Sequence, residues 1–163
     1  MEEREQERTK EEEAIRRLMF DTNKIDGAYY LFSKRFGVNE NTLALLYALD
    51  DGMPHSQKQI CEDWLIPKTT VNTNVKELAA AGYVMLFPEQ GTREKIIGLT
   101  PKGKEYASRI LKSVYEAEQA AIKKAKQAFS LEFVDAMDFF ANSLCRELEK
   151  RMPEEKMDRK DFL

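Results

Sequence analysis

Two long stripes of apolar residues, one near each end of the chain, most constrain how this sequence can fold. From Ile15 to Phe36 the apolar positions recur at steps of three and four, with one interruption. This spacing returns to one face of an α-helix, so it predicts an amphipathic helix of about six turns that ends at Gly37. A second stripe begins at Phe133, in a helix predicted to open near Ser130.

The two stripes together exceed what the short elements between them would cover, and they favour a dimer interface. The alternative interpretation of the same spacing is that these residues form the core of a monomer, which is the commoner role of such a stripe. The residues expected in the dimer interface are Ile15, Leu18, Ile25, Phe133, Met137, Phe140 and Leu144.

The chain between the stripes predicts shorter elements with recognisable start signals. Asn39 or Asn41 can cap a second helix, which stops at Gly52. Ser56, followed three residues later by Gln59, has the spacing of a capping box and starts a third helix.

A fourth helix, a hairpin and a long fifth helix follow. Pro67 suits the first turn of a helix, and Gly82 suits its end. The β-prone runs "YVMLFPE" and "KIIGLT" are joined by a glycine-containing turn, which predicts a β-hairpin. The long helix then begins at Thr100-Pro101.

The fourth helix carries an unexpected set of side chains on its exposed face. Val71, Val75 and Leu78 share one side and predict its buried face. The other positions are rich in threonine and asparagine, which are mediocre helix formers. Short polar side chains let a helix approach base edges in the DNA major groove, so the two helices read as a helix-turn-helix. The residues expected to contact DNA are Ser56, Gln57, Lys68, Thr69, Thr70, Asn72, Thr73, Asn74, Lys76, Arg93 and Lys95.

The charge of the chain neither supports nor excludes a nucleic-acid partner. The net charge is −3. Acidic residues dominate positions 1–13, whereas positions 66–105 hold a slight excess of basic ones. Attraction to phosphate depends on the local potential within a Debye length of about 8 Å, so a basic face can coexist with an acidic chain.

Other classes of protein are disfavoured by what the sequence lacks. No apolar run approaches the roughly 20 residues that span a bilayer. No secretion signal precedes Cys61 and Cys145, so we expect reduced thiols in the cytoplasm, with packing favoured over redox sensing. His55 and the two cysteines have no metal-ligand spacing, and we expect no metal, cofactor or enzymatic activity.

The segments "SQKQICEDWLIPKTTVNTNVKELAAAGYV" and "GTREKIIGLTPKGKEYA" resemble the multiple antibiotic resistance regulator (MarR) family, and the order of elements agrees from Ile15 to Arg151. The resemblance implies a homodimer with intertwined terminal helices that binds a pseudo-palindromic operator on double-stranded DNA. It also implies a repressor that a small aromatic ligand releases. Tyr29, Phe32 and Tyr47 are candidates for that ligand site, although aromatic residues at helical spacing are more often core.

The expected fold class is therefore mainly α with a small β-hairpin wing: a winged helix-turn-helix with long N- and C-terminal dimerisation helices. The expected domains are an N-terminal dimerisation helix with an acidic leader (1–36), a DNA-binding domain (37–100) and C-terminal dimerisation helices (101–163). The competing interpretation is a winged-helix module for protein–protein interaction, without specific DNA binding.

Overall fold

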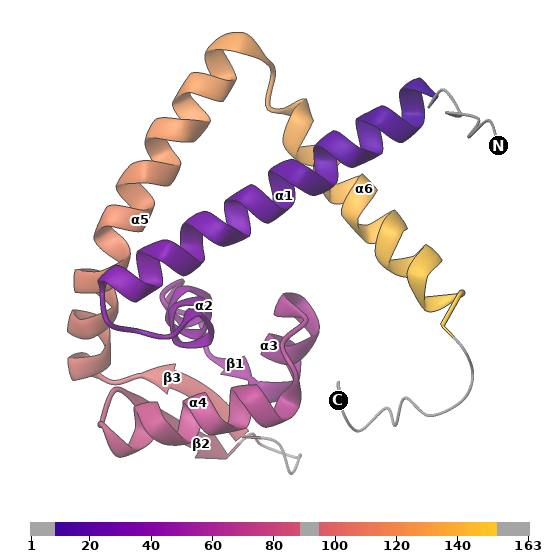
Figure 1. The fold of residues 1–163 in the computed structure, drawn as a ribbon. Helices are drawn as coiled ribbons and strands as arrows, with labels where there is room; N and C mark the ends of the chain where they lie inside the picture. Colours follow the sequence, from indigo (N-terminus) through magenta and orange to yellow (C-terminus); the bar gives the residue numbers. More distant parts are fainter. Residues whose placement is uncertain (1–8, 89–94, 153–163) are drawn as a thin grey trace, which may run out of the picture. The chain divides into compact units, whose positions relative to one another are not determined.

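The computed structural model describes residues 9–88 and 95–152, and it divides into two compact units, Met1–Leu43 and Ala44–Leu163. The first unit holds α1 (Lys10–Arg35) and the start of α2 (Glu40–Leu49). The second unit holds the rest of α2 and, in chain order, β1 (His55–Ser56), α3 (Gln57–Trp64), α4 (Lys68–Ala80), β2 (Val84–Pro88), β3 (Lys95–Leu99), α5 (Pro101–Ala128) and α6 (Glu132–Glu149) (Figure 1). Within the described ranges, no helix is long and apolar enough to cross a bilayer.

The long helix predicted from the first apolar stripe is confirmed as α1, and it starts earlier than the stripe does. Its N-terminus is a capping box, in which the Glu12 backbone N–H donates to Thr9 Oγ1 (3.2 Å) and the Thr9 N–H donates to Glu12 Oε2 (2.8 Å). Phe36 is the C-cap, and Gly37 follows with a φ of 68°. This positive φ is the reason that glycine suits the position.

The shorter helices begin at two of the predicted caps. Asn39 caps α2, because its Oδ1 accepts a hydrogen bond of 2.7 Å from the backbone N–H of Thr42. Ser56 caps α3, because its Oγ accepts a hydrogen bond of 3.0 Å from the N–H of Gln59. Both bonds satisfy backbone donors that the first turn of a helix leaves unpaired.

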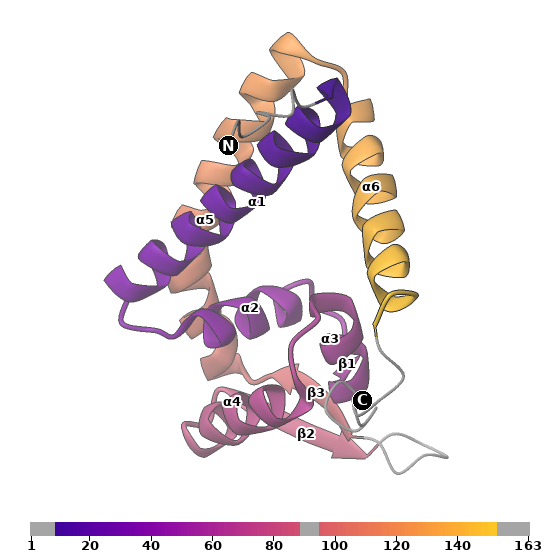
Figure 2. The same ribbon diagram turned by 45° about the vertical axis from the view of Figure 1, so that its right-hand side comes forward.

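The predicted hairpin is confirmed, and it gains a third strand. Strands β2 and β3 pair antiparallel, with Leu86 opposite Ile97. β1 pairs antiparallel with the other edge of β3, with His55 opposite Ile97, and the strand order is β1-β3-β2 (Figure 2). The sequence analysis predicted no strand at His55 and Ser56, which pair with β3 because it offers a free edge.

The core of the second unit is built from several elements. Its largest fully buried apolar side chains come from α2, α3, α4, β3 and α5: Leu45, Leu46, Ile60, Val75, Ile97 and Leu111. The first half of α5 continues this core with Ala107, Ile110 and Val114, all buried. The predicted boundaries after residues 36 and 100 remain predictions, whereas the compact units divide between Leu43 and Ala44.

The start of α5 is tied to the end of α4 through Thr100. Its backbone N–H donates to the Tyr83 carbonyl (3.0 Å), and its hydroxyl donates to the Gly82 carbonyl (2.7 Å). The same hydroxyl oxygen accepts from the Gly103 N–H (2.9 Å) and thereby caps α5. One threonine thus fixes the exit of the hairpin relative to the helix before it.

Two further residues of the "TPKG" run also hold the start of α5 against the end of α4. A Cβ added at Gly103 would lie 1.8 Å from the Tyr83 carbonyl oxygen, so only glycine allows this approach of α5. Lys102 Nζ donates to the Ala81 carbonyl (2.8 Å) at the C-terminus of α4, and it lies 4.8 Å from the centre of the Tyr83 ring. A cation at a helix C-terminus is favourable because the helix dipole is negative there.

Candidate nucleic-acid interface

Helix α4 has one buried and one exposed face, as its sequence predicts. Val71, Val75 and Leu78 are 3%, 0% and 5% exposed. The exposed face carries short polar and basic side chains: Lys68, Thr69, Asn72, Thr73 and Lys76. These spacings of three, four and seven residues return to one side of the helix. The apolar anchors therefore fix which side chains α4 can present to a partner.

Asn74 does not belong to this exposed face, and its predicted DNA contact is corrected. Its side chain is only 6% exposed, and its Nδ2 donates to the Thr70 carbonyl (2.8 Å). Position 74 lies three residues after Val71 and four before Leu78, so it shares the buried side. The helical spacing in the sequence therefore already indicated that Asn74 is buried.

The two central residues of the exposed face differ in what they can offer to a base. The Thr73 hydroxyl donates to the Thr69 carbonyl one turn earlier (2.9 Å), so its proton is used within the helix. Its methyl group remains as a contact surface, of the kind that meets a thymine methyl. Asn72 is exposed, and its amide has no hydrogen bond to any described residue, which leaves both donor and acceptor groups for a base edge. Thr70 is half-buried.

The N-terminus of α4 has no side-chain cap. Pro67 precedes the helix and forms no side-chain hydrogen bond there, while its carbonyl accepts from the N–H groups of Thr70 (2.9 Å) and Val71 (3.0 Å). In an α-helix, the N–H groups that precede these in the first turn have no intrahelical acceptor. This end carries the positive pole of the helix dipole and suits an anion such as a phosphate.

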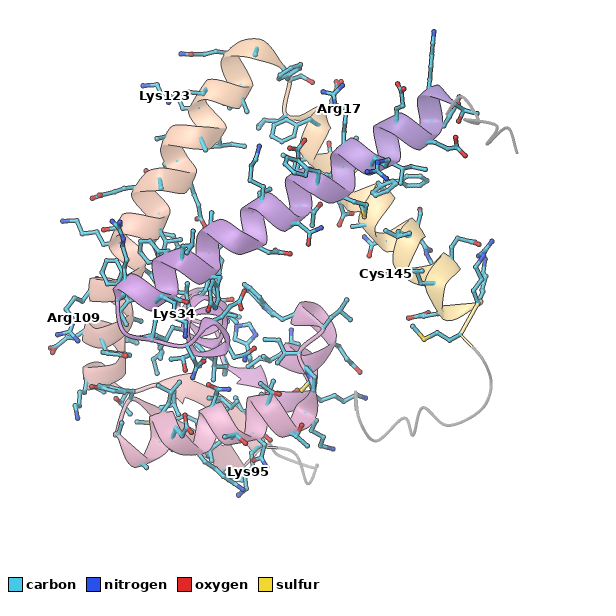
Figure 3. All side chains as sticks on the ribbon, viewed as in Figure 1. Arg17, Lys34, Lys95, Arg109, Lys123 and Cys145 are labelled. Carbon is cyan, nitrogen blue, oxygen red and sulfur yellow. The ribbon has the colours of Figure 1, made fainter. Side chains whose placement is uncertain are left out.

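The remaining predicted DNA contacts lie around this helix or outside the described residues. Lys95 starts β3 and is exposed (Figure 3). Ser56 and Gln57 are half-buried at the start of α3, where the Ser56 oxygen is already an acceptor for the helix cap. Arg93, predicted as the minor-groove contact, lies outside the described residues.

The three predicted ligand-site residues belong to different units. Tyr29 and Phe32 are half-buried on α1, and Phe32 stacks on Phe36 with ring centroids 4.5 Å apart. Tyr47 is on α2 in the second unit and meets Trp64 of α3 edge-on, with centroids 5.6 Å apart. The sequence analysis did not include Trp64, because no local pattern connects it with α2.

Tyr47 and its neighbour Tyr115 both donate to carboxylates. Tyr47 Oη donates to Glu118 Oε2 (3.2 Å), and Tyr115 Oη donates to Asp50 Oδ2 (2.9 Å). Burial raises the pKa of Tyr47, and Glu118 raises it further. The pKa of Tyr115 is also raised, first by burial and then by its hydrogen bond to Asp50. Both phenols therefore stay protonated, and they join α2 to α5.

The predicted interface stripes are exposed in the single chain. On α1, Ile15 is 48% exposed, Leu18 36% and Ile25 56%. Phe133 and Met137 of α6 are 40% and 39% exposed. Phe140 and Leu144, the other predicted members on α6, are half-buried, and no residue of this helix is buried. Exposed apolar faces of this extent are typical of interaction surfaces.

The cysteines differ in accessibility. Cys61 is 2% exposed, and burial raises the pKa of its thiol, which disfavours the reactive thiolate. Cys145 is exposed on α6 (Figure 3). Neither forms a disulfide with a described residue.

Comparisons with known proteins agree with this arrangement. Residues 36–93 match the sequence profile of the MarR family. The fold is similar to a MarR family regulator from Neisseria meningitidis, with 24% identity, a TM-score of 0.73, and coverage of 85% of this chain and 99% of that one. Staphylococcus aureus MarR in complex with salicylate and kanamycin is 18% identical, with a TM-score of 0.60 and coverage of 87% and 94%. NadR in complex with 4-hydroxyphenylacetate is 13% identical, with a TM-score of 0.64 and coverage of 87% and 96%. No curated protein matched.

A capped α3, a short turn, the two-faced α4 and a β-hairpin in chain order define a winged helix-turn-helix protein. Within that class, residues 36–93 match the MarR family model, and the fold is similar to that of MarR family regulators. The similarity to regulators of this family supports a role in transcriptional regulation.

Proposed function

We propose that this protein binds double-stranded DNA sequence-specifically, as a homodimer on a pseudo-palindromic operator. The single observation that carries the proposal is the exposed face of α4. Its base-reading side chains, Asn72 and Thr73, stand directly opposite a buried apolar face, with Lys76 one turn further on. A recognition helix needs this arrangement, because the buried face orients the polar face toward the groove.

The chemistry of the exposed face divides the contacts into two kinds. Asn72 can bond the N6 and N7 of adenine as a bidentate pair, and Thr73 can place its methyl group against thymine. Lys68 and Lys76, together with the first-turn N–H groups, suit phosphates, which position a protein without specifying sequence. Arg93 and Lys95 of the hairpin are proposed as further backbone or minor-groove contacts.

The exposed stripes of α1 and α6 support the homodimer. A closed two-fold dimer presents two copies of α4, so its operator should mirror that symmetry. We further propose that the protein acts in the cytoplasm as a repressor, and that a small aromatic effector releases it from DNA. Tyr29, Phe32 and Tyr47 remain the proposed effector residues.

Selection of bound duplexes from random DNA tests this function. We expect the enriched sequences to be inverted repeats whose half-site centres lie about 10 base pairs, or a multiple of this, apart. Enrichment of no sequence, or of unpaired single sites, would contradict the proposal.

Salt dependence separates DNA binding from the competing function, a protein-interaction module. A protein that neutralises several phosphates loses affinity steeply as salt rises, because counterions are released on binding. An apolar protein–protein contact would show no such slope. Titrations of the selected duplex at several salt concentrations therefore distinguish the two functions.

A further inference from the structure

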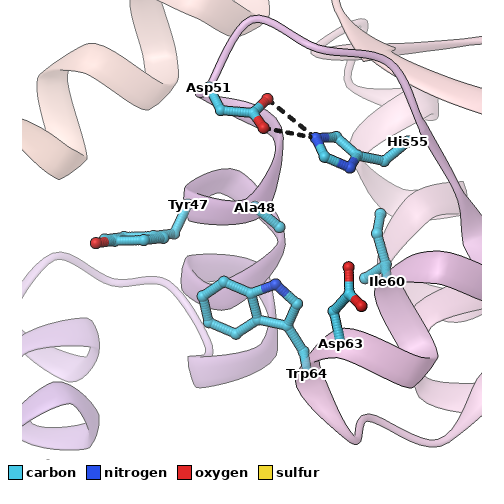
Figure 4. A pocket seen from close by; sticks show the side chains of 7 residues that line it. All are labelled: Tyr47, Ala48, Asp51, His55, Ile60, Asp63 and Trp64. Carbon is cyan, nitrogen blue, oxygen red and sulfur yellow. Dashed lines mark hydrogen bonds and ion pairs between the residues drawn. The ribbon is translucent and has the colours of Figure 1, made fainter. Parts of the chain in front are cut away.

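A pocket of about 270 Å³ opens in the second unit between α2, the turn after it, β1 and α3 (Figure 4). Side chains that line it include Tyr47, Asp51, His55, Ile60, Asp63 and Trp64. Of the three predicted ligand residues, only Tyr47 is among them. The volume is just below the range of roughly 300–1,000 Å³ for drug-sized ligands, so it suits a small, single-ring molecule.

Two aromatic rings form a corner of this pocket. Tyr47 and Trp64 meet at an interplanar angle of 66°, with their centroids 5.6 Å apart. Trp64 is 40% exposed, so part of its ring remains open to a ligand. Aromatic faces carry negative electrostatic potential, and perpendicular rings of this kind attract ammonium groups in known cation sites.

The charged groups of the pocket are carboxylates. Both oxygens of Asp51 are hydrogen-bonded to His55 Nε2, at 2.9 and 3.0 Å. This contact and the Met53 N–H lower the pKa of Asp51, so the carboxylate is ionised. Asp63 forms no ion pair or hydrogen bond with any described residue. No lysine or arginine of the described chain lines the pocket.

The pocket is poorly suited to an anion. The hydroxyl proton of Tyr47, a natural donor to a ligand carboxylate, is already directed to Glu118. An aromatic acid would therefore meet two carboxylates, Asp63 and the Asp51 that is bonded to His55, and no lysine or arginine among the described lining residues. Like charges repel, so this environment disfavours anions and favours cations.

Asp63 does not stabilise the helix in which it lies. It lies in the last turn of α3, next to Glu62, and this turn holds no basic residue. A negative charge near a helix C-terminus is unfavourable, because the helix dipole is negative there. This carboxylate is exposed at the pocket, where it is able to pair with a cationic ligand.

We propose that this pocket binds a small organic cation, with its ammonium group held against the Tyr47 and Trp64 rings and paired with Asp63. The ligand class is a monoamine or quaternary ammonium of single-ring size. This binding site goes beyond the proposed DNA binding and does not depend on it.

The test uses the full-length protein and three probes of similar size but different charge: benzyltrimethylammonium, benzyl alcohol and benzoate. Trp64 is the only tryptophan of the chain, so its fluorescence reports directly on this pocket. At matched ionic strength, we expect saturable quenching by the cation and affinities at least about tenfold weaker for the other two probes. Equal or tighter binding of benzoate, or no saturable binding of the cation at millimolar concentration, would overturn the proposal.

A pair of variants assigns the effect to one carboxylate. Asp63→Asn should weaken binding of the cation about tenfold or more and leave benzyl alcohol unchanged. Its circular dichroism should match the wild type, because the fold does not need this charge. Glu62→Gln is the matched control, since Glu62 pairs with Lys58 (3.8 Å) and does not line the pocket.

Equal losses in the two variants, or no loss in Asp63→Asn, would contradict the role of Asp63.

DNA binding is measured in parallel on the same preparations. A protein that binds the cation but no DNA would contradict the proposed function and leave this binding site standing. The reverse result would refute the cation site alone.

Discussion

Leu65 ends α3 in a backbone conformation that residues with a Cβ disfavour. Its φ of 47° and ψ of 36° lie in the left-handed region, where it is the only non-glycine residue within the described ranges. The side chain is 63% exposed, so packing gives little compensation. The Cβ of a residue in this region costs roughly 1–2 kcal/mol. The turn between α3 and α4 is therefore under strain.

Leu65→Gly is expected to stabilise the protein. Glycine removes the steric cost, while its greater freedom in the unfolded chain takes back about 0.5–1 kcal/mol. The net gain in the free energy of unfolding should be about 0.5–1 kcal/mol. Urea denaturation at matched protein concentration measures it. Leu65→Ala keeps the Cβ and should show no gain, so equal stabilities of the two variants would argue against strain.

Asn72→Ala should weaken binding to the selected operator by about 1–3 kcal/mol and change binding to a scrambled duplex little. The reason is that a bidentate contact is lost only where the cognate base is present. Titrations of both duplexes at one salt concentration measure the difference. Equal losses on the two duplexes would refute base reading by Asn72.

Lys76→Ala should instead weaken all duplexes alike and lower the salt slope by about one unit. Lys76 is exposed one turn after Asn72 on the same face, where it suits a phosphate. Titrations of both duplexes across a salt series give the slope. A change in the preferred bases would mean that α4 is placed wrongly in the groove.

The packing of α5 against the segment between α4 and the hairpin depends on one close approach, that of Gly103 to the Tyr83 backbone. Gly103→Ala is expected to destabilise the protein by about 1–3 kcal/mol, as overpacking does, because the new Cβ would meet the Tyr83 carbonyl oxygen at 1.8 Å. The backbone of Tyr83 cannot move freely, since Thr100 is bonded to its carbonyl. Thermal or urea unfolding measures the loss.

Gly27→Ala is the matched control for this prediction. It replaces a glycine inside α1 at which an added Cβ meets nothing within 4 Å. Alanine in a helix interior should stabilise by about 0.5–1 kcal/mol relative to glycine. Equal effects at positions 27 and 103 would mean that the approach of α5 to Tyr83 is not tight.

Helices α1 and α6 expose apolar side chains that suit a partner surface in the proposed homodimer. We expect sedimentation at micromolar concentration to give about twice the chain mass of 18.9 kDa. Met137→Lys places a charge in the apolar stripe of α6 and should shift the protein toward monomer, because an unpaired charge in an apolar interface is costly. Asp135→Lys also introduces a lysine, but on the opposite side of α6, and it should leave the dimer intact. A wild-type monomer would contradict the proposed homodimer.

Much of the helical framework was predictable from the sequence because its signals act over three or four residues. Asn39, Ser56 and Thr100 cap helices through hydrogen bonds to backbone groups that follow closely in the chain. The inward positions of Val71 and Val75 follow from helical periodicity alone. The same periodicity also indicates that Asn74 is buried. The prediction missed this because it relied on the polarity of the side chain and not on its position in the helix.

Contacts between distant segments were decided only by packing. His55 and Ser56 form a strand because β3, some forty residues later, offers them a free edge. Gly103 has its role because Tyr83 is brought against it, and Tyr47 meets Trp64 because α2 packs beside α3. Local sequence patterns do not specify which distant backbone segment or ring will pack against a residue, since that depends on the tertiary packing of the second unit.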